Sequence, residues 1–204
     1  MELFIGLDVS LASTAICVLN THGKEVKEAT VASEPEQLVA FLRDLSASIA
    51  VVGLEAGPLS QWLHKHLKEA GFETVLMETR QVKGALKAMP IKTDRRDAAG
   101  IARLLQMGWF RPVHCKSVSA QEMRAVLTAR KSIQQACINL ELSLRGVLRN
   151  FGLKIGKISR GGFEFRVREL TEGNHMLEAA AGPILEARAA LRSELATLEK
   201  LTRD

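Results

Sequence analysis

The sequence predicts an α/β fold, with a mixed sheet flanked by helices and, after it, long helices that form a helical or coiled-coil appendage. Two features of the 204-residue chain lead to this prediction. Over residues 1–78, three strand-like stretches in succession are followed by helical and strand-like stretches in alternation. Beyond residue 118, apolar residues recur at helical spacing over two long runs. With 47% hydrophobic residues, the chain can bury one sizeable core and still carry such an appendage.

The first three strands are predicted at residues 3–8, 14–19 and 25–31, where apolar residues run continuously or alternate with polar ones. Short connections separate these strands, and the connection around Gly23 has the composition of a tight turn. Strands joined in this way pair as an antiparallel meander.

Helices and strands alternate after the meander, because the spacing of apolar residues switches between helical and strand periods. Three meandering strands followed by this alternation is the order of an RNase H-like fold, in which the first and fourth strands are neighbours in the sheet. The alternating elements are a helix at 35–47, a strand at 49–54, a helix at 58–70, a strand at 73–77 and a helix at about 80–87.

The second half of the chain is predicted to be helical. Thr93 is a good N-cap for a helix at 94–106. A long basic helix is expected at about 119–150, and a Gly- and Lys-rich break at 152–162 separates it from a last helix at 175–201. We expect two domains, a catalytic domain over residues 1–110 and a helical one over 111–204.

The last helix carries an apolar residue at every seventh position, which suits packing within the chain as well as a seam between copies of it. Arg188, in the alternate position of this stripe, argues against a regular coiled coil. We keep a homo-oligomer formed through the helical segments as an expectation. The stripe consists of Leu177, Ile184, Leu191 and Leu198.

Basic side chains are concentrated in the middle of the chain, although the net charge is only +5. Residues 1–110 hold 12 basic and 13 acidic groups, residues 111–170 hold 12 and 4, and residues 171–204 hold 4 and 6. A basic segment beside a near-neutral module is typical of a protein that binds nucleic acid, while solvation of a long helix is the simpler alternative. The expected contacts are Lys92, Arg95, Arg96, Arg124, Arg130, Lys131, Arg145 and Arg149.

Cysteine usage and hydropathy exclude several other classes. The three cysteines are widely spaced with no C-x-x-C, so neither a disulfide framework nor a thiolate metal site is indicated. No apolar stretch approaches the roughly 20 residues of a membrane span, and the N-terminus has no secretory signal. The cytoplasm is the expected location.

Four carboxylates form the candidate catalytic and metal-binding site. Asp8 and Glu55 end two apolar runs, and Asp94 and Asp97 lie three residues apart on one face of a helix. Phosphodiester cleavage uses two divalent ions about 3.5–4 Å apart, and Mg²⁺ prefers oxygen ligands. The four acids therefore predict a site for Mg²⁺ or Mn²⁺.

Each acid also has an ordinary structural interpretation. Asp94 and Asp97 would suit the positive end of their helix without any metal, and Asp8 would cap its own loop. Glu55 is harder to explain in this way, because an unpaired charge at the end of an apolar run is costly. The hypothesis of a metal site depends on all four occurring in one element order.

Three motifs resemble the DEDD transposases of the insertion-sequence-110 (IS110) family, also called Piv/MooV-like recombinases. The resemblance covers about residues 3–153 and implies a RuvC-like domain of the RNase H type. It further implies that Asp8, Glu55, Asp94 and Asp97 hold Mg²⁺ at the scissile phosphate during DNA cleavage and recombination. The motifs are Ile5-Gly6-Leu7-Asp8-Val9-Ser10, Gly53-Leu54-Glu55-Ala56-Gly57 and Lys92-Thr93-Asp94-Arg95-Arg96-Asp97-Ala98.

The same resemblance implies partners and a further domain. Family members bind DNA, some are guided by a structured RNA, and they carry a second, C-terminal transposase domain with a serine nucleophile. This sequence ends at Asp204, before any such domain, so we expect an N-terminal part that does not complete recombination by itself.

Other functions compete with this interpretation. The four acids would equally serve a stand-alone RuvC-like nuclease. A non-catalytic nucleic-acid-binding or dimerisation fragment would bind without any dependence on metal. An actin-like ATPase or sugar kinase is disfavoured, because the sequence lacks a second phosphate loop and a Gly-rich adenosine motif.

Overall fold

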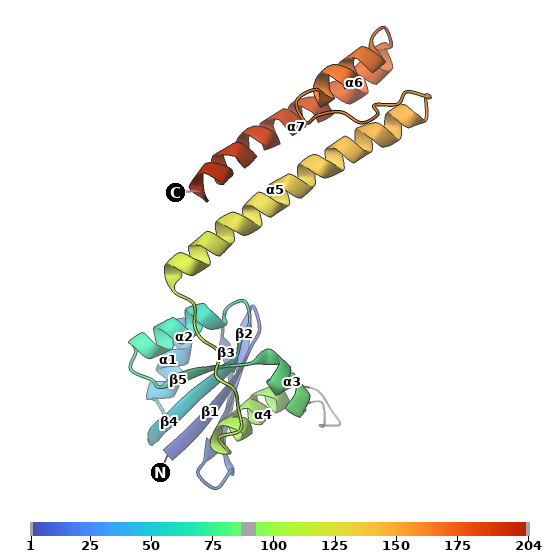
Figure 1. Ribbon diagram of the computed structural model, residues 1–204. Helices are drawn as coiled ribbons and strands as arrows, with labels where there is room; N and C mark the ends of the chain where they lie inside the picture. Colours follow the sequence, from blue (N-terminus) through green and yellow to red (C-terminus); the bar gives the residue numbers. More distant parts are fainter. Residues whose placement is uncertain (1, 87–92, 203–204) are drawn as a thin grey trace. The chain divides into compact units, whose positions relative to one another are not determined.

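The computed structural model describes residues 2–86 and 93–202 of the chain (Figure 1). The chain divides into two compact units, Met1–Lys116 and Ser117–Asp204, which we call unit 1 and unit 2. Unit 1 contains the sheet, and unit 2 consists of helices.

The sheet of unit 1 has five strands in the order β3-β2-β1-β4-β5. The first three strands pair antiparallel as a meander, whereas β4 runs parallel to β1 and β5 runs parallel to β4. This is the RNase H-like arrangement, and it confirms the predicted fold class and the predicted neighbours β1 and β4. The strands are β1 (Glu2–Val9), β2 (Ser13–Asn20), β3 (Glu25–Ala32), β4 (Ser48–Glu55) and β5 (Thr74–Met77), each within one residue of its predicted bounds.

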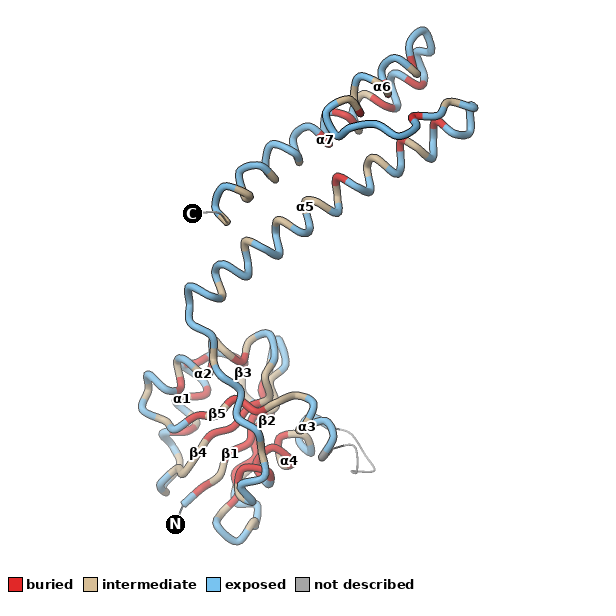
Figure 2. The backbone as a smooth tube through the Cα atoms, in the orientation of Figure 1, coloured by how far each residue is buried: buried red, intermediate tan, exposed pale blue. Residues whose placement is uncertain are grey.

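The first two helices cover one face of this sheet, and the fourth covers the other. Leu38 of α1 and Leu63 of α2 share a buried cluster with Leu7 and Leu54. Ala98 of α4 is buried against β2 instead. Figure 2 shows the buried stretches of β1, β2 and β4 in the middle of unit 1. The helices are α1 (Pro35–Arg43), α2 (Ser60–Glu69), α3 (Thr79–Leu86) and α4 (Asp94–Gln106).

Two of these helices are shorter than their apolar spacing predicts. The helix expected to reach residue 47 ends at Arg43, where the Asp44 amide donates to the Ala40 carbonyl and the Leu45 amide donates to the Leu42 carbonyl. The helix expected at 58–70 begins only at Ser60. Lys87, the predicted last residue of α3, lies outside the described residues.

Unit 2 is built on two long antiparallel helices, α5 (Val118–Arg149) and α7 (His175–Leu201), with the short α6 (Phe163–Thr171) packed at one end. The antiparallel direction follows from two ion pairs, Arg130 to Glu199 at 3.0 Å and Arg188 to Glu141 at 2.7 Å. The buried cluster of this unit contains Leu144, Leu148, Ile155, Phe163, Val167, Leu177, Ala181 and Leu185.

The predicted heptad stripe of α7 is turned toward α5 of the same chain. Leu177 is buried, and the other three members, Ile184, Leu191 and Leu198, are half-buried. Arg188 is buried as well, with 3% of its side chain exposed. Its guanidinium donates to Glu141 and to the Arg160 carbonyl, so the polar residue is part of the seam between the helices.

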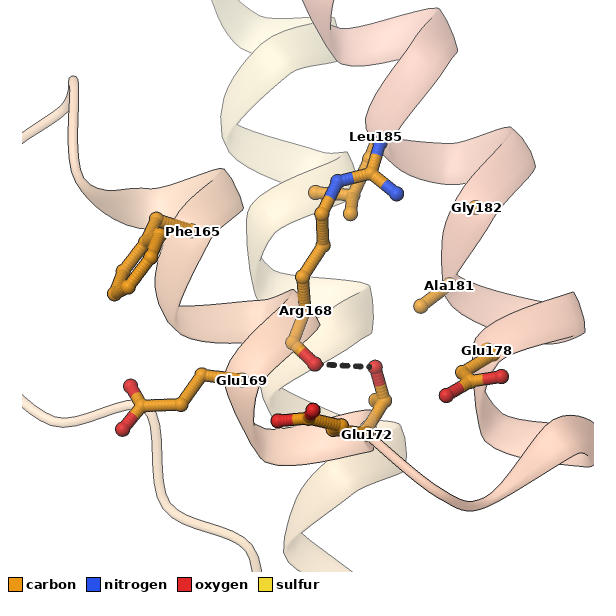
Figure 3. A pocket seen from close by; sticks show the side chains of 9 residues that line it. Phe165, Arg168, Glu169, Glu172, Glu178, Ala181, Gly182 and Leu185 are labelled. Atoms are coloured by element: carbon orange, nitrogen blue, oxygen red, sulfur yellow. Dashed lines mark hydrogen bonds between the residues drawn. The ribbon is translucent and has the colours of Figure 1, made fainter.

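A groove of about 530 Å³ lies between α6 and α7 (Figure 3). Thr171 Oγ1 donates to the Arg168 carbonyl at 3.2 Å, the contact drawn as a dashed line. Two of the acids at this groove already have partners: Glu169 forms an ion pair with Arg166, and Glu178 lies 3.6 Å from Nδ1 of His175. The groove is lined by Phe165, Arg168, Glu169, Thr171, Glu172, Glu178, Ala181, Gly182 and Leu185.

In the part of the chain that the structure describes, no helix combines the length and the apolar character that crossing a membrane requires.

Candidate active site

The two strand-borne acids lie at the carboxyl ends of two parallel central strands. Asp8 is the penultimate residue of β1, and Glu55 is the last residue of β4. Leu7 and Leu54 are the last registered pair of these strands, so the two acids follow side by side on strands that lie roughly 4.8 Å apart. Both are half-buried. The strand order alone thus brings together two residues that are far apart in sequence.

Glycines on the same two strands determine which face the acids share. A Cβ at Gly6 would overlap the Ala98 carbonyl of α4, and a Cβ at Gly53 would lie 2.5 Å from Cδ1 of Leu105. Both glycines therefore face α4. Side chains alternate along a strand, so Asp8 and Glu55, two residues further on, point to that same face.

The first turn of α4 brings the second pair of acids toward the same end of the sheet. Gln106, at the last position of α4, donates to the Thr21 carbonyl at 3.1 Å, which places the end of the helix at the turn between β2 and β3. That turn lies at the amino end of β1, because Leu3 pairs with Asn20. The beginning of α4 therefore lies toward the carboxyl end of β1.

The N-terminus of α4 is capped as predicted. Thr93 Oγ1 accepts from the Arg96 amide at 3.3 Å, and the Asp97 amide donates to the Thr93 carbonyl at 2.9 Å. Asp94 is exposed and Asp97 is half-buried. Both acids sit in the first turn, where the helix dipole favours negative charge.

The four acids do not close into a coordination shell. Over residues 2–86 and 93–202, no group of three or more His, Cys, Asp or Glu side chains lies close enough together to hold a metal ion. The donor chemistry fits a hard divalent cation, because all four groups are carboxylates. Their placement fits only in part: Asp8 and Glu55 are adjacent, and the first turn of α4 would have to approach them for shared coordination.

Lys83 of α3 is a neighbour of the site that sequence reasoning missed. Its Nζ lies 3.9 Å from Oε1 of Glu55, with 64% of the lysine side chain and 24% of the glutamate side chain exposed. An ion pair so long and so exposed contributes little stability. It does place a cation beside a candidate ligand. Nothing in the local sequence around Lys83 indicates this, because the contact depends on how α3 follows β5.

A small pocket adjoins the carboxylates at the same end of the sheet. It has a volume of about 100 Å³ and lies between the connection from β1 to β2 and the connection from β4 to α2. Glu55 belongs both to this pocket and to the candidate metal site. The lining residues are Val9, Ser10, Leu11, Glu55, Gly57, Pro58, Leu59 and Ser60.

The predicted nucleic-acid contacts of unit 1 surround the N-terminus of α4. Lys92 lies outside the described residues. Arg95 and Arg96 are exposed, and Arg95 approaches Glu28 of β3 at 4.0 Å. These two cations stand next to the acids of the same helix.

The predicted contacts of unit 2 divide into two groups. Arg124, Lys131 and Arg149 are exposed on α5. The other two are engaged within the unit: Arg130 pairs with Glu199, while Arg145 donates to the Gly156 carbonyl at 2.8 Å and lies 5.3 Å from the centre of the Phe163 ring. In the part of the chain that the structure describes, the side chains of the first group make no such contacts within the unit.

Cys17 and His64 of unit 1, both outside the candidate site, have shifted pKa values. Cys17, paired with Gly6 across the strands, has its pKa raised to about 12, mainly by burial and further by Glu25 and Glu28. It is therefore a neutral thiol. The pKa of His64 is lowered from 6.5, first by burial and then by Lys68.

Comparison with known proteins places the chain among transposases. The family model for IS110-type DEDD proteins, described as a transposase, matches residues 5–152. The chain is 26% identical over 161 residues to the transposase for insertion sequence element IS1111A of Coxiella burnetii, covering 78% of this chain and 42% of that protein. It is 27% identical over 137 residues to the transposase for insertion sequence element IS1533 of Leptospira borgpetersenii, covering 65% and 39%. The chain thus spans about two fifths of the length of these relatives.

Among solved structures, the chain is similar to RuvC of T. thermophilus. The RuvC complex with a Holliday junction substrate has 15% sequence identity and a TM-score of 0.42, covering 55% of this chain and 100% of that one. A second structure of Thermus thermophilus RuvC has 16% identity and a TM-score of 0.40, covering 54% and 99%.

Proposed function

Because the chain belongs to the IS110-type family of DEDD transposases, we propose that unit 1 carries the acidic site with which a transposase cleaves and rejoins DNA strands. Family membership is the outcome that the sequence motifs predicted. We further propose that this chain takes part in catalysis, that it binds a divalent metal and that it binds nucleic acid.

The observation that carries the proposal is the register between β1 and β4. It sets Asp8 beside Glu55 at the carboxyl ends of two parallel strands, on the face covered by α4. The edge formed by strand carboxyl ends is where open α/β sheets bind their ligands. A pair of half-buried carboxylates at this edge has no evident role in stabilising the core, because like charges held together repel.

We assign Asp8, Glu55, Asp94 and Asp97 as the ligands of Mg²⁺ or Mn²⁺. A divalent ion in this position would activate the attacking oxygen and stabilise the leaving oxygen of a phosphodiester. The strands hold Asp8 and Glu55 in fixed positions. The first turn of α4 directs backbone N–H groups and the positive end of its dipole toward the same end of the sheet, which favours an approaching phosphate.

The basic residues would bind the nucleic acid itself. The exposed cations that we propose as phosphate contacts are Arg95 and Arg96 in unit 1 and Arg124, Lys131 and Arg149 in unit 2. DNA is the proposed substrate, a structured guide RNA a further partner, and association through the helices of unit 2 the proposed route to an oligomer. We place this activity in the cytoplasm.

The decisive experiment is calorimetric titration of Mn²⁺ into the wild type and into the Asp8→Asn and Glu55→Gln variants, with and without single-stranded DNA. We expect saturable binding that each substitution abolishes, because each removes one of two adjacent charges. Asp44→Asn is the matched control, since this exposed acid forms an ion pair with Lys27 and belongs to no part of the candidate site. Equal Mn²⁺ binding by the wild type and the Asp8→Asn variant would exclude the carboxylates from the site.

A second candidate function has its own support. The described residues contain no three-carboxylate group within metal-binding range, which favours a nucleic-acid-binding or dimerisation module without catalysis. Such a module would bind DNA with the same affinity in EDTA and in Mn²⁺. The titration with DNA therefore separates the two functions.

A further inference from the structure

We propose that the pocket beside Glu55 receives the sugar of the nucleotide next to the cleaved phosphate, and that Leu11 makes it selective for deoxyribose over ribose. This inference rests on the proposed function, because it takes Glu55 as part of the phosphate-binding site. It adds a specificity-determining residue that lies outside the four acids.

Leu11 stands at the tip of the connection between β1 and β2, with 86% of its surface exposed. It contributes nothing to the core, so its apolar side chain is not explained by folding. Together with Val9, Pro58 and Leu59 it gives the pocket apolar walls on both sides. A single exposed leucine needs no explanation, whereas one that completes a pocket beside a candidate catalytic acid does.

The position and the size of the pocket indicate the sugar as its occupant. Glu55 lines the pocket, so a phosphate bound at the carboxylates would hold its own sugar, one ester linkage away, at the pocket entrance. The volume of about 100 Å³ corresponds to roughly three water molecules. That suits a five-membered sugar ring and is too small for a sugar together with its base.

The backbone groups of Gly57 and Ser10, one on each side of the pocket, already have hydrogen-bond partners. The Gly57 amide donates to Ser60 Oγ at 2.8 Å, and Ser60 Oγ donates back to the Gly57 carbonyl at 2.7 Å. On the opposite side, the Ser10 amide donates to the Ser13 carbonyl at 3.0 Å, and Ser33 Oγ donates to the Ser10 carbonyl at 2.8 Å. Neither of these two amides is left to donate a hydrogen bond to the oxygen of an entering hydroxyl.

A ribose 2′-hydroxyl would therefore lose its water against apolar walls without full compensation. A buried hydroxyl without a partner weakens binding by roughly 10-fold or more, whereas the hydrogen of a deoxyribose carries no such penalty. Of the two serines that line the pocket, Ser60 uses its hydroxyl within the turn, whereas the Ser10 hydroxyl makes no hydrogen bond in the described part of the chain. Removing the Ser10 hydroxyl gives a second variant, in which the preference for deoxyribose should not fall.

The test compares the affinities of the wild type for a fluorescent oligothymidylate and for the 5-methyluridine oligomer of equal length, which differ only at the 2′ position. Fluorescence anisotropy is measured in Ca²⁺ and in EDTA. In Ca²⁺ we expect the deoxy strand to bind about 10-fold more tightly. In Leu11→Asn, whose amide can meet the hydroxyl, the preference should fall to about 2-fold, and in Ser10→Ala it should stay or increase.

Met107→Asn is the matched control. Met107 is 68% exposed and caps the end of α4, at the opposite end of unit 1 from the pocket, so its substitution should leave the 10-fold preference unchanged. An identical preference in the wild type and in Leu11→Asn, or no preference in the wild type, would overturn the proposal.

The Asp8→Asn variant distinguishes failure of this inference from failure of the proposed function. If the carboxylate site is correct and the pocket is not, Asp8→Asn loses the Ca²⁺-dependent part of binding while Leu11→Asn leaves the sugar preference intact. If the carboxylate site is wrong, Asp8→Asn binds both strands as the wild type does. Absence of binding by either strand would overturn both.

Discussion

At the scale of single residues, Gly6 and Gly53 determine how closely α4 approaches the sheet. Both face this helix, and the space that a Cβ would need is occupied by the Ala98 carbonyl in one case and by Leu105 in the other. The first turn of α4 carries two of the candidate ligands. The position of these acids therefore depends on the absence of a side chain at Gly6 and Gly53.

Gly6→Ala is expected to lower the free energy of unfolding by about 1–3 kcal/mol, since the added methyl meets backbone atoms that cannot rotate away. Denaturation in urea measures this change. Gly84→Ala is the control: it lies in α3 with nothing within 4 Å of the added Cβ, so we expect about 0.5–1 kcal/mol of stabilisation. Equal effects at the two glycines would contradict the role of Gly6.

His64 gives unit 1 a pH-dependent contribution to stability. Its lowered pKa means that the unfolded chain binds the proton first, so the contribution is complete above pH 6.5 and is lost as the pH falls toward the pKa of the folded state. We expect His64→Gln to flatten the pH dependence of the melting temperature in this window. His22→Gln, on the exposed turn between β2 and β3, should retain the wild-type slope. A steep slope in the His64 variant would assign the effect to other groups.

At the scale of elements, the seam between α5 and α7 combines apolar packing with one buried charge. Arg188 is enclosed by Glu141, the Arg160 carbonyl and the ring of Phe163, whose centre lies 4.7 Å from the guanidinium carbon. A buried ion pair is weak support for stability as a pair, yet removing one partner leaves an uncompensated charge.

Arg188→Ala should therefore destabilise unit 2 by about 3 kcal/mol or more, whereas the double variant Arg188→Met with Glu141→Leu should recover most of that loss. Circular dichroism during urea denaturation reports both. The exposed pair of Arg168 and Glu164 supplies the comparison, and Arg168→Ala should cost no more than about 1 kcal/mol. A double variant as unstable as Arg188→Ala would show that packing, not the stranded charge, is responsible.

Elements with strong periodicity were predictable from the sequence, and contacts between elements were not. The five strands and the neighbouring position of β1 and β4 follow from apolar patterning and element order. The helix α6 was missed because only Phe163, Val167 and Thr171 of its nine residues are buried, which is too weak a pattern after two glycines. The burial of Arg188 was not foreseen either, since its partner Glu141 lies 47 residues away.

The candidate site likewise combines features that the sequence predicts with features that depend on packing between elements. Strand order accounts for the adjacency of Asp8 and Glu55, and Thr93 capping accounts for the first turn of α4. The distance between the two pairs of acids depends on how α4 packs on the sheet, which local patterning does not encode. The pocket beside Leu11 and the contact of Lys83 with Glu55 likewise depend on loops and on α3.

At the scale of the whole molecule, the two units differ in charge. Unit 1 holds 14 basic and 13 acidic groups, and unit 2 holds 14 and 10. The acidic candidate site thus belongs to a nearly neutral unit, and the surplus of cations belongs to the helical one. Each unit can be tested separately by substitution within the intact chain.

We expect DNA affinity to fall with salt concentration, and replacing Arg124, Lys131 and Arg149 by Gln should reduce the slope of log affinity against log salt by up to about one per lost phosphate contact. Anisotropy titrations over a salt series measure the slope. Arg168→Gln, an ion-paired cation of the same unit, should leave it unchanged. An unaltered slope in the triple variant would remove α5 from the nucleic-acid interface.

The two ion pairs between α5 and α7 have a consequence for assembly. They are separated by 11 residues on each helix, from Arg130 to Glu141 and from Arg188 to Glu199, so both specify the same alignment. Sliding α7 by one heptad would set Arg188 against Gln134 or Leu148 and leave its charge without a partner. The pairs do not distinguish the chain that supplies α7, because a second copy carries the same residues. An exchange of α7 between two copies would therefore preserve both ion pairs.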